Sequence, residues 1–219
     1  MRVCSGVSVL VRAARVHEVD GLPFQAVEAT TLASRVVRGI VLWLFAWRGW
    51  KLEGEKPAAR RCVIVGAPHT SNWDFVFFLG ATHHFGILPR FMGKASLFLW
   101  PLRRFMFDMG GVPVNRSKRA NYADAMVAAF AEHEEFALVI APEGTRSSVG
   151  KWRSGFWHIA NAAQVPIVLA WVCNKTMRGG LGPAIMPSGD YAADMEQIGA
   201  FYRGIMPGHP KWAAFDAAD

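Results

Sequence analysis

The fold of this chain is decided by residues 61–74, which read RCVIVGAPHTSNWD. Residues 62–65 form an apolar, β-branched run of strand length, and Gly66 and Pro68 end that run. The pattern predicts a buried strand over residues 61–67 that delivers His69 to a loop. In open α/β sheets, chemistry gathers at the carboxyl ends of strands. The loop that carries His69 is therefore a candidate functional site.

His69 is followed five residues later by Asp74. We expect Asn72 to cap a helix over residues 72–84, with Asp74 in its first turn, so that the carboxylate can fold back toward the imidazole. An imidazole accepts protons near neutral pH, and a carboxylate on its other ring nitrogen fixes the tautomer and stabilises the imidazolium. The pair suits a general base that deprotonates a substrate hydroxyl. The alternative is a structural pair, with the carboxylate placed by the helix dipole.

The rest of the chain alternates strands with helices. We expect strands over residues 88–93, 111–115, 136–141 and 166–172, and helices over 30–50, 120–135, 154–163 (capped by Ser154) and 192–205. Pro101 interrupts any helix between residues 95 and 107. This order predicts an α/β fold, in which a single sheet is flanked by helices on both faces.

Three further blocks follow the histidine block in order. They read GVPVNRS at residues 111–117, APEGTRS at 141–147 and VPIVL at 165–169. Together with the His69–Asp74 block, they resemble the glycerolipid acyltransferase family, which includes 1-acylglycerol-3-phosphate acyltransferase. The resemblance implies the same architecture, with an N-terminal helical element added to the sheet and its helices.

The resemblance also implies roles for individual residues. His69 is the general base and Asp74 its orienting partner. Arg116 matches the phosphate-binding arginine of the family, and a guanidinium can hold a phosphate through two parallel hydrogen bonds. A strand-end arginine in a surface salt bridge is the other interpretation of Arg116.

In the third block, Glu143 and Gly144 match residues that shape the acceptor pocket. Glu143 can bond backbone N–H groups or acceptor hydroxyls, or it can simply stabilise a turn. Gly144 permits a tight turn. Thr145 and Arg146 complete the block, and Arg146 is a second candidate for binding an anion.

The implied activity is that of a membrane-associated O-acyltransferase. It moves a fatty acyl group from acyl-CoA or acyl-carrier protein to a lysophospholipid such as 1-acylglycerol-3-phosphate. Because a thioester is already activated, we expect no metal and no cofactor beyond this co-substrate. Pro68 and Ala141 stand where many members carry Asn and an aromatic residue. Another lyso-lipid acceptor, such as lyso-ornithine lipid or a glycolipid, is therefore the alternative.

Composition leaves a non-enzymatic function open. The net charge is +7 over 219 residues, and residues 1–119 hold 17 Lys and Arg against 7 Asp and Glu. Such a basic half favours an anionic partner, either lipid headgroups or nucleic acid. We expect no nucleic acid, because no DNA- or RNA-binding motif is evident. Three scattered cysteines without a Cys-x-x-Cys pair predict neither a structural zinc site nor a disulfide framework.

Residues 39–47, GIVLWLFAW, lie between Arg38 and Arg48 and are too short to cross a bilayer. The expected helix over residues 30–50 suits the membrane interface, with tryptophans at the boundary and arginines at the headgroups. A buried packing helix is the alternative. The interfacial interpretation predicts a peripheral or monotopic protein on the cytoplasmic face of the cell membrane, with the lipid bilayer as a partner.

The domain organisation is simple. Residues 1–25 are predicted to be a flexible extension, and residues 26–219 to be a single acyltransferase domain. The first sixteen residues contain three arginines and no acidic residue, a composition shared by organellar transit peptides and by ordinary disordered starts.

Overall fold

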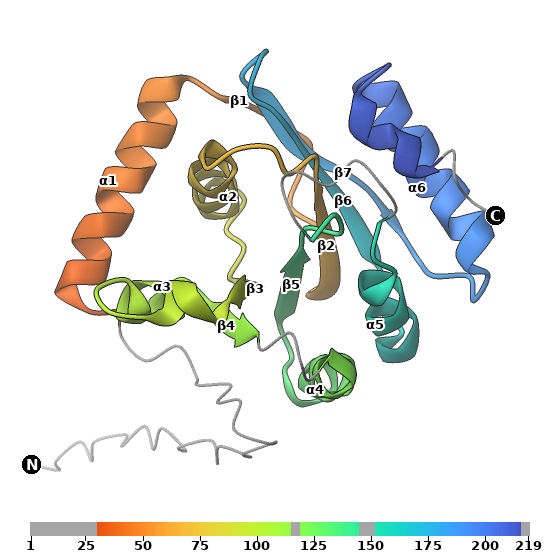
Figure 1. The fold of residues 1–219 in the computed structure, drawn as a ribbon, viewed down its shortest axis with the longest axis horizontal. Helices are drawn as coiled ribbons and strands as arrows, with labels where there is room; N and C mark the ends of the chain where they lie inside the picture. The colour runs from red at the N-terminus through yellow and green to blue at the C-terminus, as the bar shows by residue number, and fades with distance from the viewer. Residues whose placement is uncertain (1–29, 115–118, 145–151, 216–219) are drawn as a thin grey trace, which may run out of the picture.

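A single mixed sheet of seven strands, with helices on both faces, organises the protein (Figure 1). The computed structural model describes residues 30–114, 119–144 and 152–215. The strand order is β1-β7-β6-β2-β5-β3-β4. The strands are β1 (Lys51–Glu53), β2 (Arg61–Ala67), β3 (Pro89–Lys94), β4 (Gly111–Val114), β5 (Phe136–Ile140), β6 (Ile167–Cys173) and β7 (Arg178–Ile185). The predicted α/β class is confirmed.

Five strands of the sheet run parallel. β2 pairs in parallel with β5 on one side and with β6 on the other, and β3 joins β5 to β4 in the same direction. β7 is antiparallel to β6, and β1 pairs with β7 alone. The carboxyl ends of β2, β3, β4, β5 and β6 therefore share one edge of the sheet, where open α/β sheets build their sites.

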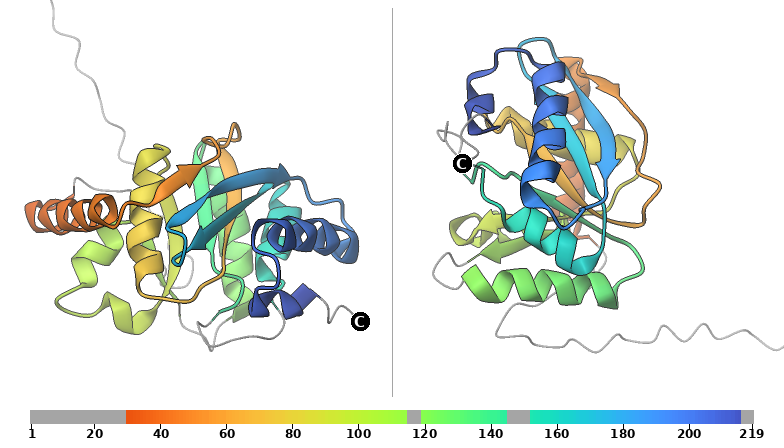
Figure 2. Two further views of the ribbon diagram at one scale, coloured as in Figure 1. Left: turned by 90° about the horizontal axis from the view of Figure 1, so that it is seen from above. Right: turned by 90° about the vertical axis from the view of Figure 1, so that its right-hand side faces the viewer.

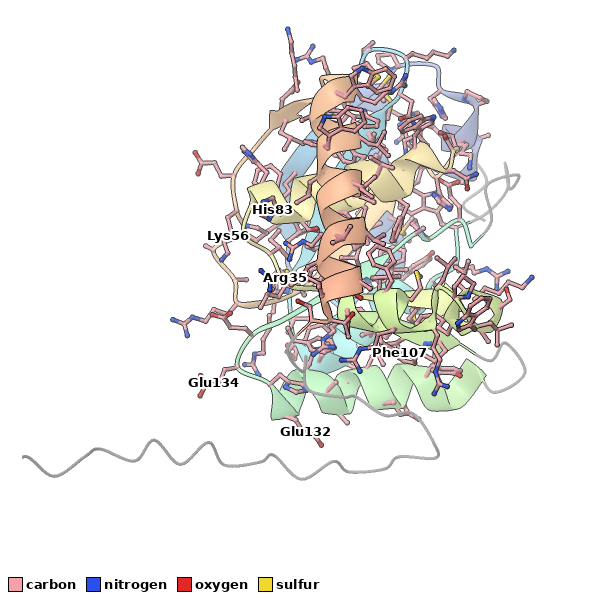
Figure 3. The ribbon with its side chains drawn as sticks, turned by 90° about the vertical axis from the view of Figure 1, so that its left-hand side faces the viewer. Arg35, Lys56, His83, Phe107, Glu132 and Glu134 are labelled. Carbon is pink, nitrogen blue, oxygen red and sulfur yellow. The ribbon has the colours of Figure 1, made fainter. Side chains whose placement is uncertain are left out.

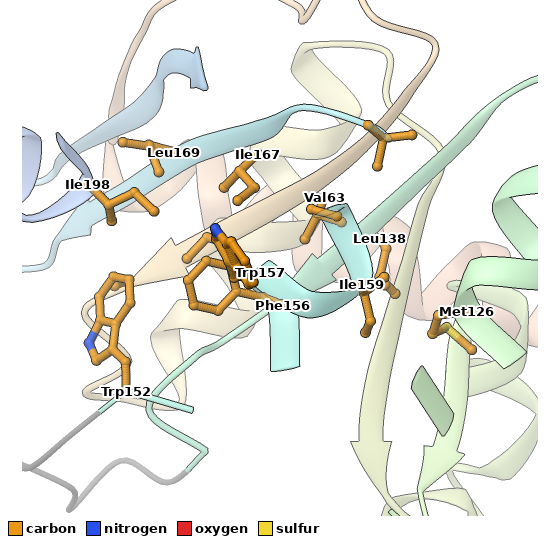
Figure 4. Close-up of a cluster of buried hydrophobic side chains, with 14 of the residues drawn as sticks. Val63, Met126, Leu138, Trp152, Phe156, Trp157, Ile159, Ile167, Leu169 and Ile198 are labelled. Carbon is orange, nitrogen blue, oxygen red and sulfur yellow. The ribbon is translucent and has the colours of Figure 1, made fainter. Parts of the chain in front are cut away.

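Alternating residues of β2 supply two hydrophobic cores, as the strand period of two requires. Val63 and Val65 face a cluster built with helices α4 (Arg119–Glu132), α5 (Gly155–Ala163) and α6 (Tyr191–Ile205) (Figure 4). Cys62 and Ile64 face the opposite cluster, which includes Phe77 of helix α2 (Trp73–His84). Figure 2 shows the sheet between α2 on one face and α4, α5 and α6 on the other. Because β2 is buried on both faces of the sheet, nearly all of its residues are apolar.

Helix α1 (Leu32–Arg48) packs on the outside of α2 and lies across one side of the molecule (Figure 3). Gly80 of α2 allows a close approach, because a side chain there would collide with the ring of Phe45. Thr31 caps the start of α1, and its backbone N–H also donates to Asp108 at the end of helix α3 (Arg103–Asp108). In the described part of the chain, no helix is long and apolar enough to span a membrane.

Two expected helix caps are wrong. Neither Asn72 nor Ser154 makes a side-chain capping bond, and both have helical backbone angles rather than the extended angles of a capping residue. Ser71 accepts instead from the N–H of Trp73, at 3.0 Å. The prediction for residues 1–25 lies outside the described residues.

Candidate active site

The catalytic candidates meet where β2 ends and α2 begins. β2 ends at Ala67 and α2 begins at Trp73, so His69 lies in the loop between them and Asp74 in the first turn of the helix. His69 Nδ1 and Asp74 Oδ2 are 3.1 Å apart. The Asp74 side chain is 8% exposed and that of His69 is 31% exposed. The carboxylate is therefore buried behind an imidazole that solvent can reach.

The Asp74 carboxylate organises the whole loop. Its Oδ2 atom also accepts hydrogen bonds from the backbone N–H groups of Thr70 and Ser71, at 2.7 and 2.8 Å. Its Oδ1 atom accepts from Asn174 Nδ2 at 2.7 Å. Burial alone would raise the pKa of Asp74, but the hydrogen bonds from His69, Ser71, Asn174 and Thr70 together hold its pKa below the usual value. Asp74 is thus an ionised group at neutral pH, with its donors already in place.

This arrangement determines which nitrogen of His69 can work as a base. The Nδ1–H group donates to Asp74, so Nε2 is the nitrogen left to accept a proton. Asp74 also stabilises the imidazolium that results. A hydroxyl group placed near Nε2 could be deprotonated as it attacks an electrophile, without a nucleophilic side chain from the protein.

Glu143 follows β5 at the same edge of the sheet. Its Oε1 atom accepts the backbone N–H of His69 at 2.8 Å, and its Oε2 atom accepts from Lys211 Nζ. The residue is only 4% exposed. Burial raises the pKa of Glu143, although Lys211 and the N–H of His69 act in the opposite direction. In this position, the carboxylate supports the histidine loop directly.

Gly144 occupies a turn with φ of +71°, in the left-handed region that glycine adopts without strain. Its N–H donates to Ala141 O at 3.2 Å, and a side chain at this position would collide with Arg153. The positive φ therefore favours glycine at this turn, and any larger residue would also displace the Arg153 side chain.

Three of the predicted site residues, Arg116, Thr145 and Arg146, lie outside the described residues. Lys94, another cation at this edge, is the last residue of β3 and is paired in register with Val114 of β4. The described strands thus bring His69, Asp74 and Glu143 together, with Lys94 on the same edge.

Two polar residues of the site were not predicted from the sequence. Asn174 follows β6 and reaches Asp74 from 100 residues away. Lys211 lies in the short 3₁₀ helix η2 (Pro210–Phe215), and its Nζ atom also donates to the carbonyl oxygen of His69 at 2.6 Å. The only sequence signal for Lys211 is that one lysine stands among apolar residues, in KWAAF.

Among the residues that the structure describes, no group of three His, Cys, Asp or Glu side chains lies close enough to hold a metal ion. The described groups of the site are one imidazole, two buried carboxylates and the hydrogen bonds that hold them.

Comparison with known proteins adds one finding. A protein-family model described as "Acyltransferase" matches residues 50–172, which are more than half of the chain. The matched region contains His69, Asp74 and Glu143, whereas α1 and η2 lie outside it. No curated protein matches the chain.

Proposed function

This chain belongs to the glycerolipid acyltransferase family, and from that premise we propose that it is a membrane-associated O-acyltransferase. It takes a fatty acyl group from acyl-CoA or acyl-carrier protein and transfers it to the hydroxyl of a lysophospholipid such as 1-acylglycerol-3-phosphate. The observation that carries the proposal is the His69–Asp74 pair, 3.1 Å apart at the carboxyl edge of the parallel strands.

The proposed reaction uses these groups in one acyl transfer. Nε2 of His69 takes the proton of the acceptor hydroxyl as its oxygen attacks the thioester carbonyl. The C–O bond forms, the tetrahedral intermediate collapses with cleavage of the C–S bond, and the departing thiolate takes the proton from the imidazolium. The products are the acylated lipid and the free thiol. Asp74 remains ionised throughout and holds the ring in one tautomer.

Arg116 is the residue that we propose to select the acceptor. If Arg116 holds a phosphate, phosphate-bearing lyso-lipids are the preferred acceptors. We expect Arg116→Ala to raise the KM for 1-acylglycerol-3-phosphate by roughly 10- to 100-fold, because a charge-assisted bond to phosphate is lost. The KM for the thioester should not change. Release of free thiol from a long-chain acyl-CoA measures both constants.

The control for this substitution is Arg60→Ala, since Arg60 is exposed and lies beside the amino end of β2, away from the site. The same assay is run with lyso-ornithine lipid and a lyso-glycolipid as acceptors. Higher turnover with one of these two lipids, together with an unchanged acceptor KM in Arg116→Ala, would contradict the phosphate-bearing acceptor. It would support the lyso-ornithine lipid or glycolipid acceptor instead.

The membrane part of the proposal rests on the outer face of α1. Large apolar side chains recur along this helix at intervals of three and four residues and are 54–75% exposed. They are Leu32, Val36, Ile40, Trp43 and Trp47. A stripe of this kind needs an apolar partner, and tryptophan favours the boundary of the bilayer. Arg35, labelled in Figure 3, is exposed on the same helix and can meet anionic headgroups, whereas Arg38 contacts His83 of α2.

A second exposed apolar segment strengthens this interpretation. It comprises the end of the 3₁₀ helix η1 (Ala95–Phe98) and the connection from η1 to α3, and α3 contacts the start of α1. Its exposed residues are Leu97, Leu99, Trp100 and Leu102, and Trp100 is 91% exposed. We propose that this segment, like α1, contacts the bilayer.

We expect the double substitution Trp43→Ser and Trp47→Ser to lower binding to liposomes by at least about tenfold. The variant lacks the two indole rings that would bury apolar surface in the bilayer. Co-sedimentation with vesicles of phosphatidylcholine and phosphatidylglycerol measures the loss. Met186→Ser is the control, since Met186 is 52% exposed but lies beyond the end of β7. Undiminished binding of the double variant would remove α1 from the membrane contact.

A further inference from the structure

Lys211 is a buried cation at the site. It is 7% exposed, and the carboxylate that it contacts, Glu143, is 4% exposed. Burying an ammonium group is unfavourable unless it is paired and hydrogen-bonded. Both requirements are met here, because Nζ donates to Glu143 Oε2 and to the carbonyl oxygen of His69.

The Glu143–Lys211 pair holds the backbone of His69 at both of its polar groups. Glu143 Oε1 accepts the N–H of His69, and Lys211 Nζ donates to its C=O. Asp74 holds the ring of the same residue. The main chain and side chain of His69 are therefore fixed by separate partners that come from three different parts of the chain.

The segment that carries Lys211 is itself firmly packed. Phe215 lies 4.7 Å from the ring of Trp152, and Trp212 lies 5.1 Å from that of Tyr202, measured between ring centroids. The hydroxyl of Tyr202 donates in turn to the carbonyl oxygens of Val65 and Ala170, on β2 and β6. The aromatic packing of η2 therefore fixes the position of Lys211 beside the loop that carries His69.

We infer that Lys211 is a positioning residue of the transferase site, which sets the place of the His69 imidazole through Glu143 and the His69 backbone. The inference rests on the proposed function for its catalytic consequence. It extends the functional site to the 3₁₀ helix η2, beyond the residues 50–172 that the family model matches. Lys211 touches backbone and carboxylate atoms of the protein, so its effect on turnover passes through His69.

The first test is the activity of Lys211→Met. We expect kcat to fall by about a hundredfold, the scale on which a small misplacement of a catalytic group acts, while the KM for a long-chain acyl-CoA is unchanged. The double variant Lys211→Met with Glu143→Gln should be about tenfold faster than the single variant. It leaves no uncompensated buried charge, and the amide oxygen of glutamine can still accept the His69 N–H.

Phe215→Leu is the matched control, because it loosens the same 3₁₀ helix without removing a bond to His69. We expect it to lower Tm and to leave kcat within about threefold of the wild type. Wild-type kcat in Lys211→Met, or in the double variant if the single variant does not fold, would overturn the inference. So would an equal loss of kcat in Phe215→Leu at a matched change in Tm.

A readout without turnover separates this inference from the proposed function. The NMR signal of the His69 Cε1–H group, assigned as the one that His69→Ala removes, should shift in the Lys211 variants and not in Phe215→Leu. If the wild type shows no acyl transfer but the signal moves, the proposed function fails and the positioning role stands. An unmoved signal overturns the positioning role whatever the activity.

Discussion

We expect His69→Ala to lower kcat by about 10³- to 10⁴-fold, because in the proposed mechanism one residue supplies both the base for the acceptor hydroxyl and the proton for the departing thiol. The KM for the thioester should change little, since the imidazole contributes to the transition state more than to binding. Free-thiol release in the presence of 1-acylglycerol-3-phosphate measures the loss. The fold should survive, because the side chain of His69 is 31% exposed and its backbone keeps its bonds to Glu143 and Lys211.

His84→Ala provides the comparison. This histidine ends α2 and is exposed, so its removal should leave turnover at the wild-type level. Turnover that persists in His69→Ala and still depends on the acceptor would reject the mechanism, whatever the family of the protein.

Asp74→Asn has the second-largest expected effect, a fall in kcat of about 10²- to 10³-fold combined with a loss of stability. An asparagine side chain has one acceptor oxygen, whereas Asp74 receives four donors on its two oxygens. Placing an amide NH₂ against one of these donors disturbs the imidazole tautomer and leaves buried groups unsatisfied. We expect the free energy of unfolding to fall by about 1–3 kcal/mol, as measured by urea denaturation.

The pH dependence gives this prediction a second check. The pKa of Asp74 is lower in the folded protein than in the unfolded chain, so its stabilising contribution is complete above the unfolded value near ~4. It is lost as the pH falls through the folded value. The stability gap between the wild type and Asp74→Asn should therefore be constant near neutral pH and narrow below about pH 4.

Asp190→Asn is the control for Asp74→Asn. Asp190 caps α6 by accepting from Ala192 and Ala193, and asparagine is an equally good cap. Its stability and turnover should match those of the wild type. If Asp74→Asn behaved in the same way, the bonds around Asp74 would have no catalytic consequence.

The sequence was most informative where local pattern and tertiary role coincide. The apolar run before Gly66 predicted β2, and the five-residue spacing of His69 and Asp74 predicted the bond that the structure contains. Tyr122, Met126 and Phe130 recur at every fourth position, a spacing typical of one helix face, and in α4 each is at most 9% exposed. In these cases, neighbours in the chain are also neighbours in space.

Prediction failed where distant packing chooses the structure. β7 was missed because its residues, RGGLGPAI, carry none of the usual strand signals. Its glycines are required by close neighbours, since a side chain at Gly179 would collide with Phe77 and one at Gly180 with the backbone of Glu53. β1 is absent from the expected strands because a three-residue strand has too few positions to show alternation.

The same reason explains why part of the site was missed. Asn174 and Lys211 reach Asp74 and His69 across 100 and 142 residues, and neither belongs to a block with a recognisable spacing. A buried lysine is identified only by the carboxylate that neutralises it, and that partner is evident only after the chain has folded. The resemblance to a known family, which depends on local blocks, therefore predicted the pairing of His69 with Asp74 but not these supports.

The place of β1 at the edge of the sheet has a consequence for biosynthesis. This strand pairs with β7 alone, and Arg178 of β7 also bonds Glu53 of β1 across 125 residues of the chain. Closing so long a loop is entropically unfavourable until the final contacts form. A nascent polypeptide that ends before β7 has no strand with which β1 can pair. Helix α1 and strand β1 therefore leave the ribosome well before β1 can join the sheet.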